Sequence, residues 1–390
     1  MIRYFRHVFD NFRKGDMILL LLCLITTAFG CLVIASATNS MGSLRFVVVQ
    51  LAAAVIGVIL YAVMSSIDAD VFTEHRWHMV VFNVLLLLML YPFGTDNGTG
   101  NRSWLDFKIL PFNIQPAEIC KITFILILAS VMGAHQSKIS SLRSIGWIAL
   151  ELSIMVGVNM MASHDMGVSL IFVFTAIVMV FAGGVSMLWF VAGAILIAAA
   201  IPIAWTKVLS DYQKLRIQIL IDPSIDAAGT GPRYHTMQSM KTLTGGGMTG
   251  QGLFHGHRTQ HGALCAQHTD YIFATIGEEL GFIGCVAVIV IMLAIIVRVI
   301  WVGTRSEDYT RRLICFGSAA ALMFQVIINV GMCVGVMPVI GLTLPFISYG
   351  GSSLVSLYAM LGMVSGVYAR PTPTSQERYI RPPYMTRSLL

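Results

Sequence analysis

The sequence predicts an all-α, polytopic membrane protein with about ten transmembrane helices and one large extracytoplasmic loop between helices 7 and 8. Of its 390 residues, 56% are hydrophobic and only 11% are charged, whereas a typical soluble domain carries roughly 25% charged residues. Several apolar runs approach the ~20 residues that an α-helix needs to cross the hydrocarbon layer. Helices are the expected spanning elements because they satisfy their own backbone hydrogen bonds in lipid.

The first apolar run, Met17–Ala37, is expected to be a retained helix. It is long, it lacks a small-x-small cleavage site followed by a soluble domain, and further apolar runs follow it, so it does not resemble a cleaved signal peptide. Hydropathy places the other helices around stretches such as Ile122–Met132 and Cys285–Ile300. The ten expected helices cover residues 17–37, 45–66, 77–93, 116–134, 145–162, 165–183, 186–208, 271–301, 310–337 and 350–369.

The whole of residues 1–369 is expected to form one integral-membrane domain, and residues 370–390, rich in Pro and Arg, a disordered cytoplasmic tail. The formal charge of +6 does not indicate a nucleic-acid partner, because basic residues of membrane proteins gather in cytoplasmic loops. This rule predicts a multi-pass membrane protein, surrounded by membrane lipids, with both termini in the cytoplasm. The basic residues that agree are Arg3, Arg6, Arg13, Lys14, Lys138, Arg143, Arg298, Arg305, Arg311, Arg312, Arg370, Arg378 and Arg381.

The same count of helices places two longer polar segments outside the membrane, residues 94–115 and 209–270. The second is by far the largest loop of the chain. A loop of that length without secondary structure is uncommon and is usually functional. We therefore expect the chemistry on the outer face.

Glu118 and Lys121 form the first group of polar residues near that face. Pro116 fits the first turn of a helix, and Glu118 in that turn is favoured by the helix dipole. Residues three apart lie on one helix face, and burying either charge alone in lipid costs roughly 2.5–3.5 kcal/mol or more. The two side chains are expected to pair, either as a structural ion pair or as part of a functional site.

Two aspartates stand where helices begin on the outer side. Asp165 precedes Met166, and an N-cap is its simplest role. Asp270 closes the large loop just before the chain re-enters the membrane. It is either another cap or a general base placed to act on a lipid-anchored substrate.

Three other features of this region carry weaker signals. At 100° per residue, Glu279 points opposite to Asp270 and Glu278 about a quarter-turn away, so both are expected to pack against polar groups of neighbouring helices. The glycine run 245–252 lacks the lysine and hydroxyl residue of a nucleotide-binding loop, although its backbone can approach a pyrophosphate or sugar closely. The loop histidines lack an acidic or cysteine partner at ligand spacing, so metal ligands stay unknown.

Residues 341–353 join the last two helices on the outer side, and they contain Pro, Gly and hydroxyl residues. Ordered non-helical backbone is tolerated at membrane depth only where it is buried or lines a wet cavity. These polar groups of the sequence are thus all expected on one side of the membrane, at 102–121, 165, 270 and 345–352. This convergence predicts an external active site.

These motifs resemble the SEDS family, whose members include RodA, FtsW and SpoVE, over nearly the whole chain. Asn101-Arg102-Ser103-Trp104 with Gln115-Pro116-Ala117-Glu118 and Lys121 is similar to the family's N-G-x-x-R-W and Q-P-S-E-x-x-K stretches. Further matches are Asp165-Met166-Gly167, Tyr212-Gln213 with Arg216, Asp222-Pro223, Gln238-Ser239, the segment 250–256, 268–273 with Glu278-Glu279, and 345–352.

The resemblance implies an inverting peptidoglycan glycosyltransferase that polymerises lipid II through β-1,4 links and releases undecaprenyl pyrophosphate. Asp270 matches the family's essential loop aspartate and is the expected catalytic base. A divalent cation, Mg²⁺ or Mn²⁺, is expected to support the pyrophosphate leaving group. Arg102, Lys121 and Arg216 are expected phosphate partners. The other implied substrate-binding residues are Trp104, Gln115, Glu118, Asp165, Gln238, Ser239 and Ser352.

Some residues depart from the family pattern. Leu264-Cys265-Ala266 stands where many relatives carry L-P-E, which removes a carboxylate near the expected base, and Val168 and Ala117 replace a threonine and a serine. The pattern around Thr259-Gln260 and His268-Thr269-Asp270 is closer to RodA than to FtsW, which favours cell elongation over division. The resemblance also implies a class B penicillin-binding protein transpeptidase as partner. A lipid II flippase and a non-catalytic scaffold of the wall-synthesis complex remain the alternative functions.

Overall fold

The computed structural model describes residues 12–69, 71, 75–95, 102–106, 112–209, 211–226, 231 and 233–370. The expected tail beyond Arg370 and the basic residues Arg3 and Arg6 lie outside the described residues. Within the described part, nine helices are long and apolar enough to cross a membrane, and a shorter apolar helix, α9, has 17 residues. The expected set of about ten helices is therefore confirmed.

The helices follow the expected order. Their bounds are α2 Met17–Ala37, α3 Arg45–Ser66, α5 Arg76–Leu88 continued by α6 Leu90–Phe93, α7 Pro116–Ala134, α8 Leu142–Ala162, α9 Met166–Ala182, α10 Met187–Ile203, α14 Ile272–Arg305, α15 Tyr309–Cys333 and α16 Gly351–Ala369. Two short antiparallel strands, β1 Gly94–Thr95 and β2 Trp104–Leu105, form a hairpin beside α6.

The large loop contains more structure than the sequence indicated. It folds into α11 Asp211–Ile221, α12 Arg233–Gly245 and α13 His257–Gln260. The helix expected at 310–337 is also shorter, because α15 ends at Cys333. Gly335 takes a φ of +78° there, and the N–H groups of Val336 and Gly335 donate to the carbonyls of Gly331 and Met332. This is the glycine-terminated arrangement that commonly closes helices.

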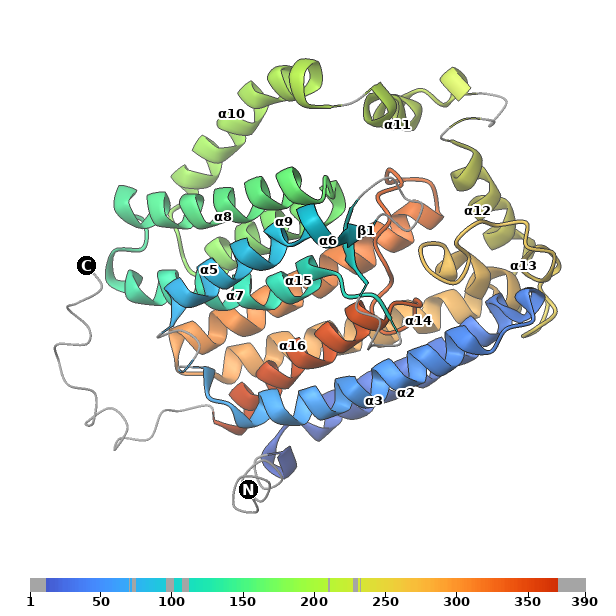
Figure 1. Cartoon of the computed structure of the whole chain (residues 1–390), viewed down its shortest axis with the longest axis horizontal. Helices are drawn as coiled ribbons and strands as arrows, with labels where there is room; N and C mark the ends of the chain where they lie inside the picture. The colour runs from blue at the N-terminus through green and yellow to red at the C-terminus, as the bar shows by residue number, and fades with distance from the viewer. Residues whose placement is uncertain are drawn as a thin grey trace.

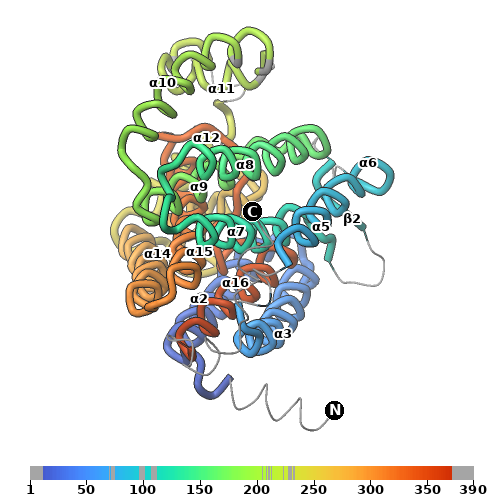
Figure 2. The backbone as a smooth tube through the Cα atoms, turned by 90° about the vertical axis from the view of Figure 1, so that its left-hand side faces the viewer, coloured from blue at the N-terminus to red at the C-terminus, as the bar shows by residue number. Residues whose placement is uncertain are grey.

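The apolar helices lie side by side with roughly aligned axes, and α16 runs along α3 (Figure 1). Helices α7, α14, α15 and α16 contain the largest numbers of buried residues. Helix α10 has no buried residue, and together with α11 it projects away from the bundle in both views (Figures 1 and 2). The described core is therefore built without α10.

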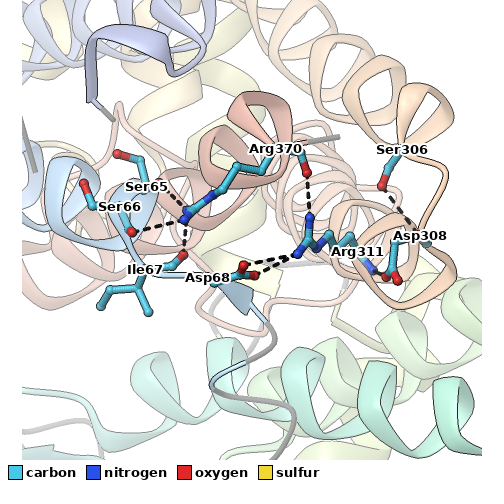
Figure 3. A network of polar contacts seen from close by, with 8 residues as sticks. All are labelled: Ser65, Ser66, Ile67, Asp68, Ser306, Asp308, Arg311 and Arg370. Carbon is cyan, nitrogen blue, oxygen red and sulfur yellow. Dashed lines mark hydrogen bonds and ion pairs between the residues drawn. The ribbon is translucent and has the colours of Figure 1, made fainter. Parts of the chain in front are cut away.

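Arg311 and Arg370 lie where α3 and α16 end and α15 begins, and they join these three helices (Figure 3). Arg311 of α15 pairs with both carboxylate oxygens of Asp68, at 3.0 and 3.2 Å, and donates to the carbonyl of Arg370 at 2.7 Å. Arg370, just after α16, donates in turn to the carbonyls of Ser65 and Ile67 at the end of α3. The arginines thus satisfy carbonyls that a helix end leaves without intrahelical partners.

Helix α14 is broken near its start by Gly281, whose φ of +67° and ψ of −166° are not helical. The glycine run 245–252 fits into this break. Four backbone hydrogen bonds join the two segments: Gln251 N to Glu278 O (3.0 Å), Gly252 N to Glu279 O (2.9 Å), Phe282 N to Gly247 O (2.9 Å) and Ile283 N to Met248 O (3.2 Å). The loop thereby satisfies the backbone groups that the break exposes, which buried backbone requires.

The close approach of the two segments explains a glycine at position 246. A Cβ atom there would collide with the carbonyl oxygen of Gly277 and lie 2.7 Å from that of Glu278. We expect Gly246→Ala to destabilise the fold by about 1–3 kcal/mol, the usual cost of overpacking, measured as a lower midpoint of thermal unfolding in detergent. Gly157→Ala in α8 is the control, because a Cβ at Gly157 meets open space. Equal midpoints for the two variants would contradict this packing role.

Candidate functional site

Four helices begin at the same end of the bundle, and their first residues carry most of the predicted site. Gln115 precedes α7, Asp165 precedes α9, Asp270 lies two residues before α14, and Ser352 is the second residue of α16. The Gln115 backbone N–H donates to Ser352 Oγ at 3.0 Å, and Gln115 Nε2 donates to Asp165 Oδ2 at 3.3 Å. The helix N-termini gathered here favour negative charge through their dipoles.

Glu118 and Lys121 form the predicted pair one turn into α7. Their Oε2 and Nζ atoms are 2.7 Å apart, and the two residues are only 5% and 4% exposed. Gln325 of α15 and Ser356 of α16 line the same small cavity, of about 10 Å³, beside the pair. A volume of that size holds about one water molecule. The burial favours a structural role for the ion pair.

Asp165 is the N-cap of α9, as its position predicted. Its Oδ1 atom accepts from the backbone N–H of Val168 at 3.1 Å. Asn159 of α8 donates from Nδ2 to the Asp165 carbonyl at 2.9 Å. The carboxylate is thus held by the helix that it caps and by Gln115 of α7.

Asp270 does not cap α14, so that alternative reading of the residue is wrong. The N-cap is Tyr271, and no side chain caps the helix there. Asn329 of α15 holds the Asp270 backbone instead, donating from Nδ2 to its carbonyl at 2.9 Å. Burial raises the pKa of the Asp270 carboxyl to about 6, and the negative charge of Asp165 adds to the rise.

Asp270 keeps part of its surface exposed as a residue, although its carboxyl is mostly surrounded by protein. Its Oδ2 atom lies against Gly341, where a Cβ would be 3.6 Å away. No hydrogen bond to this carboxylate is present among the described residues. A carboxyl whose pKa lies near neutrality is suited to accept a proton in a reaction at physiological pH.

The irregular segment between α15 and α16 supports the aspartate. As predicted for non-helical backbone at this depth, residues 344–348 are buried. Ser348 Oγ donates to the Thr269 carbonyl at 2.6 Å, and the Tyr349 N–H donates to the His268 carbonyl at 2.9 Å. Gln50 of α3 binds the segment through the Ser348 carbonyl and the Gly350 N–H. The two residues before Asp270 are therefore fixed by a neighbouring buried chain.

The loop that carries Asp270 is also held by Glu278 and Glu279. Glu278 accepts hydrogen bonds from the backbone N–H groups of Arg258 and Thr259, both at 2.8 Å, at the start of α13. Glu279 accepts from Ser36 Oγ of α2 at 2.6 Å and from Gln260 Nε2 of α13 at 3.1 Å. Both carboxylates thus serve the attachment of the loop to the bundle.

The other predicted residues surround the polar cluster without joining it. Arg102 and Trp104 lie at the β1–β2 hairpin, which reaches Gln115 through the pairing of Leu105 with Ile114. Arg216 of α11 donates from Nη1 to the Val339 carbonyl at 2.7 Å. On α12, Gln238 accepts a hydrogen bond from Arg258, and Ser239 Oγ donates to the Cys333 carbonyl at 3.0 Å. The cluster itself consists of Gln115, Glu118, Lys121, Asp165, Asp270 and Ser352.

Several polar residues of the site were missed in the sequence. Asn329 binds Asp270, Gln325 lies beside the Glu118–Lys121 pair, and Gln50 supports the buried segment. Glu151, buried in the middle of α8 near Arg76, is a further intramembrane carboxylate. Each is an isolated polar side chain in an apolar run, and such residues are functional hypotheses by default.

The chain is similar to known proteins over most of its length. The family of cell cycle proteins FtsW, RodA and SpoVE matches residues 16–371. The peptidoglycan glycosyltransferase MrdB of Escherichia coli is 33% identical over 354 residues, which cover 90% of this chain and 93% of that protein. A probable peptidoglycan glycosyltransferase FtsW of a Geobacter species is 32% identical over 367 residues, covering 91% and 97% of the two chains.

Solved structures agree with these relatives. One is a chain of a peptidoglycan synthase complex that coordinates polymerization and crosslinking, with a TM-score of 0.77, 26% identity, and coverage of 94% of this chain and 99% of that chain. Another is a variant of the rod shape determining protein RodA of Thermus thermophilus, with a TM-score of 0.68, 25% identity, and coverage of 92% and 99%. This protein belongs to the FtsW/RodA/SpoVE family of cell cycle proteins.

Proposed function

We propose that this protein is a peptidoglycan glycosyltransferase that polymerises lipid II at the outer face of the bacterial cytoplasmic membrane, with both termini in the cytoplasm. The observation that carries the proposal is Asp270, a partly exposed residue whose carboxyl has a pKa raised to about 6 by burial, beside a buried polar cluster. The names of the MrdB and FtsW relatives support the same activity.

In the proposed reaction, Asp270 takes the proton of the acceptor sugar's 4-hydroxyl as that oxygen attacks the anomeric carbon of the donor. The new C–O bond forms as the bond between the anomeric carbon and the phosphate oxygen breaks. Undecaprenyl pyrophosphate leaves with the electron pair, and the α-linkage of the donor becomes a β-1,4 link. The four helix N-termini at this end of the bundle favour the negative charge of the pyrophosphate.

A divalent cation fits this site only as a partner of the substrate. Among the described residues, no group of three or more His, Cys, Asp or Glu side chains is placed to hold a metal ion. Mg²⁺, however, is usually bound by one or two carboxylates together with substrate phosphates. We propose that Asp165 supplies such a carboxylate to a Mg²⁺ or Mn²⁺ ion, which would neutralise charge on the leaving pyrophosphate.

A class B penicillin-binding protein transpeptidase is the proposed partner. The similar chain in the peptidoglycan synthase complex belongs to an assembly that couples polymerization to crosslinking. A polymerase whose product is crosslinked outside the membrane needs a crosslinking enzyme at that face. The RodA-like features of the loop favour a partner that acts in cell elongation.

The test is glycan-strand formation from labelled lipid II by the reconstituted protein together with its cognate transpeptidase. The expected result is a ladder of glycan strands whose length grows with time and that lysozyme digests. If no strands form while labelled lipid II crosses the vesicle membrane, the protein is a transporter and the proposal fails. If the folded complex shows neither activity, the proposal also fails, and a non-catalytic scaffold is the interpretation that remains.

The pH dependence of polymerisation follows from the raised pKa of Asp270. A base must be deprotonated to act, so the rate is expected to fall about tenfold per pH unit below pH 6 and to level off above about pH 7. Asp165→Asn keeps an N-cap residue but removes a negative charge that raises this pKa. The acidic limb of the profile should therefore move to lower pH in this variant. The variant also removes the carboxylate proposed for the cation, so its overall rate should fall, and the pH profile is compared after scaling each protein to its own maximum rate. An unchanged limb would contradict the coupling of the two aspartates.

A further inference from the structure

Three aromatic side chains meet on the outer side of the bundle, beside the loop that carries Asp270. His268 stands two residues before Asp270. Phe46 is the second residue of α3, and Tyr349 stands two residues before α16. The ring centroid of Phe46 lies 4.8 Å from that of His268 and 5.1 Å from that of Tyr349. The His268 and Tyr349 centroids are 5.8 Å apart, so the three rings form one aromatic cluster.

The aromatic cluster combines apolar rings with polar atoms that a ligand can reach. All three residues are partly exposed. The Tyr349 hydroxyl and His268 Nε2 make no hydrogen bond with the described residues, yet neither atom is fully buried. Burial lowers the pKa of His268, so its ring is neutral at pH 7 and offers one donor and one acceptor. Such a surface suits a sugar, whose C–H groups approach the negative face of an aromatic ring while its hydroxyls bind the polar atoms.

Backbone hydrogen bonds fix the aromatic cluster relative to the proposed base. The Tyr349 N–H donates to the His268 carbonyl at 2.9 Å, and Ser348 Oγ donates to the Thr269 carbonyl at 2.6 Å. The rings and the Asp270 carboxyl thus belong to two short chain segments that are bonded to each other. A sugar held on the rings would keep a constant position relative to the base, which is what orientation in catalysis requires.

The aromatic cluster and Asp165 approach Asp270 from different sides. Helix α3, which carries Phe46, packs against α2 and α16, whereas α9, which Asp165 caps, packs against α7, α8 and α15. In both views α3 and α9 lie on opposite sides of α15 and α16 (Figures 1 and 2). An inverting displacement needs the attacking oxygen and the leaving group on opposite faces of the donor sugar. With the pyrophosphate on the Asp165 side, the acceptor comes from the side of α3.

We propose that Phe46, His268 and Tyr349 form the binding surface for the acceptor sugar. A pyranose ring lies against the aromatic cluster, and the Tyr349 hydroxyl and His268 Nε2 bind its hydroxyl or N-acetyl groups. The inference rests on the proposed function, and it names the part of the site that takes the acceptor rather than the pyrophosphate. The three side chains hold the sugar, while Asp270 alone takes the proton.

The experiment measures binding of the soluble disaccharide of lipid II, which lacks the lipid and the pyrophosphate, to the full-length protein in detergent. We expect the disaccharide to bind wild type and Phe46→Leu to weaken its binding about three- to tenfold, because leucine is apolar but has no aromatic face. Phe46→Tyr keeps the ring and should bind like wild type. Phe93→Leu is the matched control, the same change at an exposed phenylalanine at the end of α6. In polymerisation with the cognate transpeptidase, Phe46→Leu should raise the KM for lipid II by a similar factor and leave kcat unchanged.

Tyr349→Leu is the second variant, in case Phe46→Leu does not fold. It leaves the backbone N–H available to His268 and should weaken binding similarly. Three outcomes would overturn the proposal: unchanged affinity in the folded leucine variants, an equal loss in Phe93→Leu, or a Phe46→Tyr protein that binds no better than Phe46→Leu.

Polymerisation of lipid II by wild type with its partner is measured separately, so that the two proposals can fail independently. If wild type polymerises while the leucine variants keep full affinity for the disaccharide and an unchanged KM for lipid II, only this inference fails. If the binding pattern holds but wild type forms no glycan strands, the sugar-binding surface stands and the proposed function fails.

Discussion

Replacing Asp270 by Asn is expected to lower the rate of glycan-strand formation by about 10²–10⁴, the range that a positioned general base contributes. The asparagine keeps the size of the side chain and leaves the backbone carbonyl available to Asn329. Because the Asp270 carboxylate does not cap α14, its loss removes no helix cap. The fold should therefore survive while proton transfer is lost, and labelled lipid II with the cognate transpeptidase provides the measurement.

The matched control for this variant is Asp211→Asn, the same change at an exposed residue at the start of α11. It should polymerise at the wild-type rate. Monodisperse gel filtration and an unchanged thermal midpoint of Asp270→Asn separate loss of chemistry from loss of folding. A folded Asp270→Asn protein that polymerises at more than a tenth of the wild-type rate would show that another group accepts the proton.

The spanning helices were predictable because burial in lipid imposes a simple rule on each one separately. Any stretch of about 20 residues that must satisfy its own backbone has to be apolar and helical. The local signals at helix starts were equally readable, as the Glu118–Lys121 spacing and the Asp165 cap demonstrate. Each depends only on residues within one turn of each other.

The features that the sequence did not predict depend on contacts between distant segments. The break of α14 at Gly281 is stable because residues 247–252, which stand 29 to 34 positions earlier, fill it. Asn329 was missed because nothing in α15 itself indicates that residue 270 will lie beside it. For the same reason, the residues alone did not decide whether Asp270 is a helix cap or a general base. Its surroundings come from α9, α15 and the segment 335–342, which are distant in the sequence. Tertiary packing, rather than local preference, decides these positions.

Breaking the Glu118–Lys121 pair is expected to have the largest effect on stability. The two charged groups are 2.7 Å apart and almost fully buried, so removing one leaves the other charged and unpaired in the interior of a membrane protein. Glu118→Gln and Lys121→Met should each cost about 3–5 kcal/mol. The measurement is the fraction of folded protein extracted from membranes together with the midpoint of thermal unfolding in detergent.

The double variant Glu118→Gln/Lys121→Met separates a structural pair from a substrate-binding pair. With both partners replaced by uncharged residues of similar size, no unpaired charge stays in the interior, so the double variant should unfold at a midpoint closer to that of wild type than either single variant. Because both groups are buried with each other as partner, polymerisation should return with the fold. A double variant that folds like wild type but forms no glycan strands would contradict this. It would show that the Lys121 charge binds the pyrophosphate, so that the pair takes part in the reaction and does not only stabilise the fold.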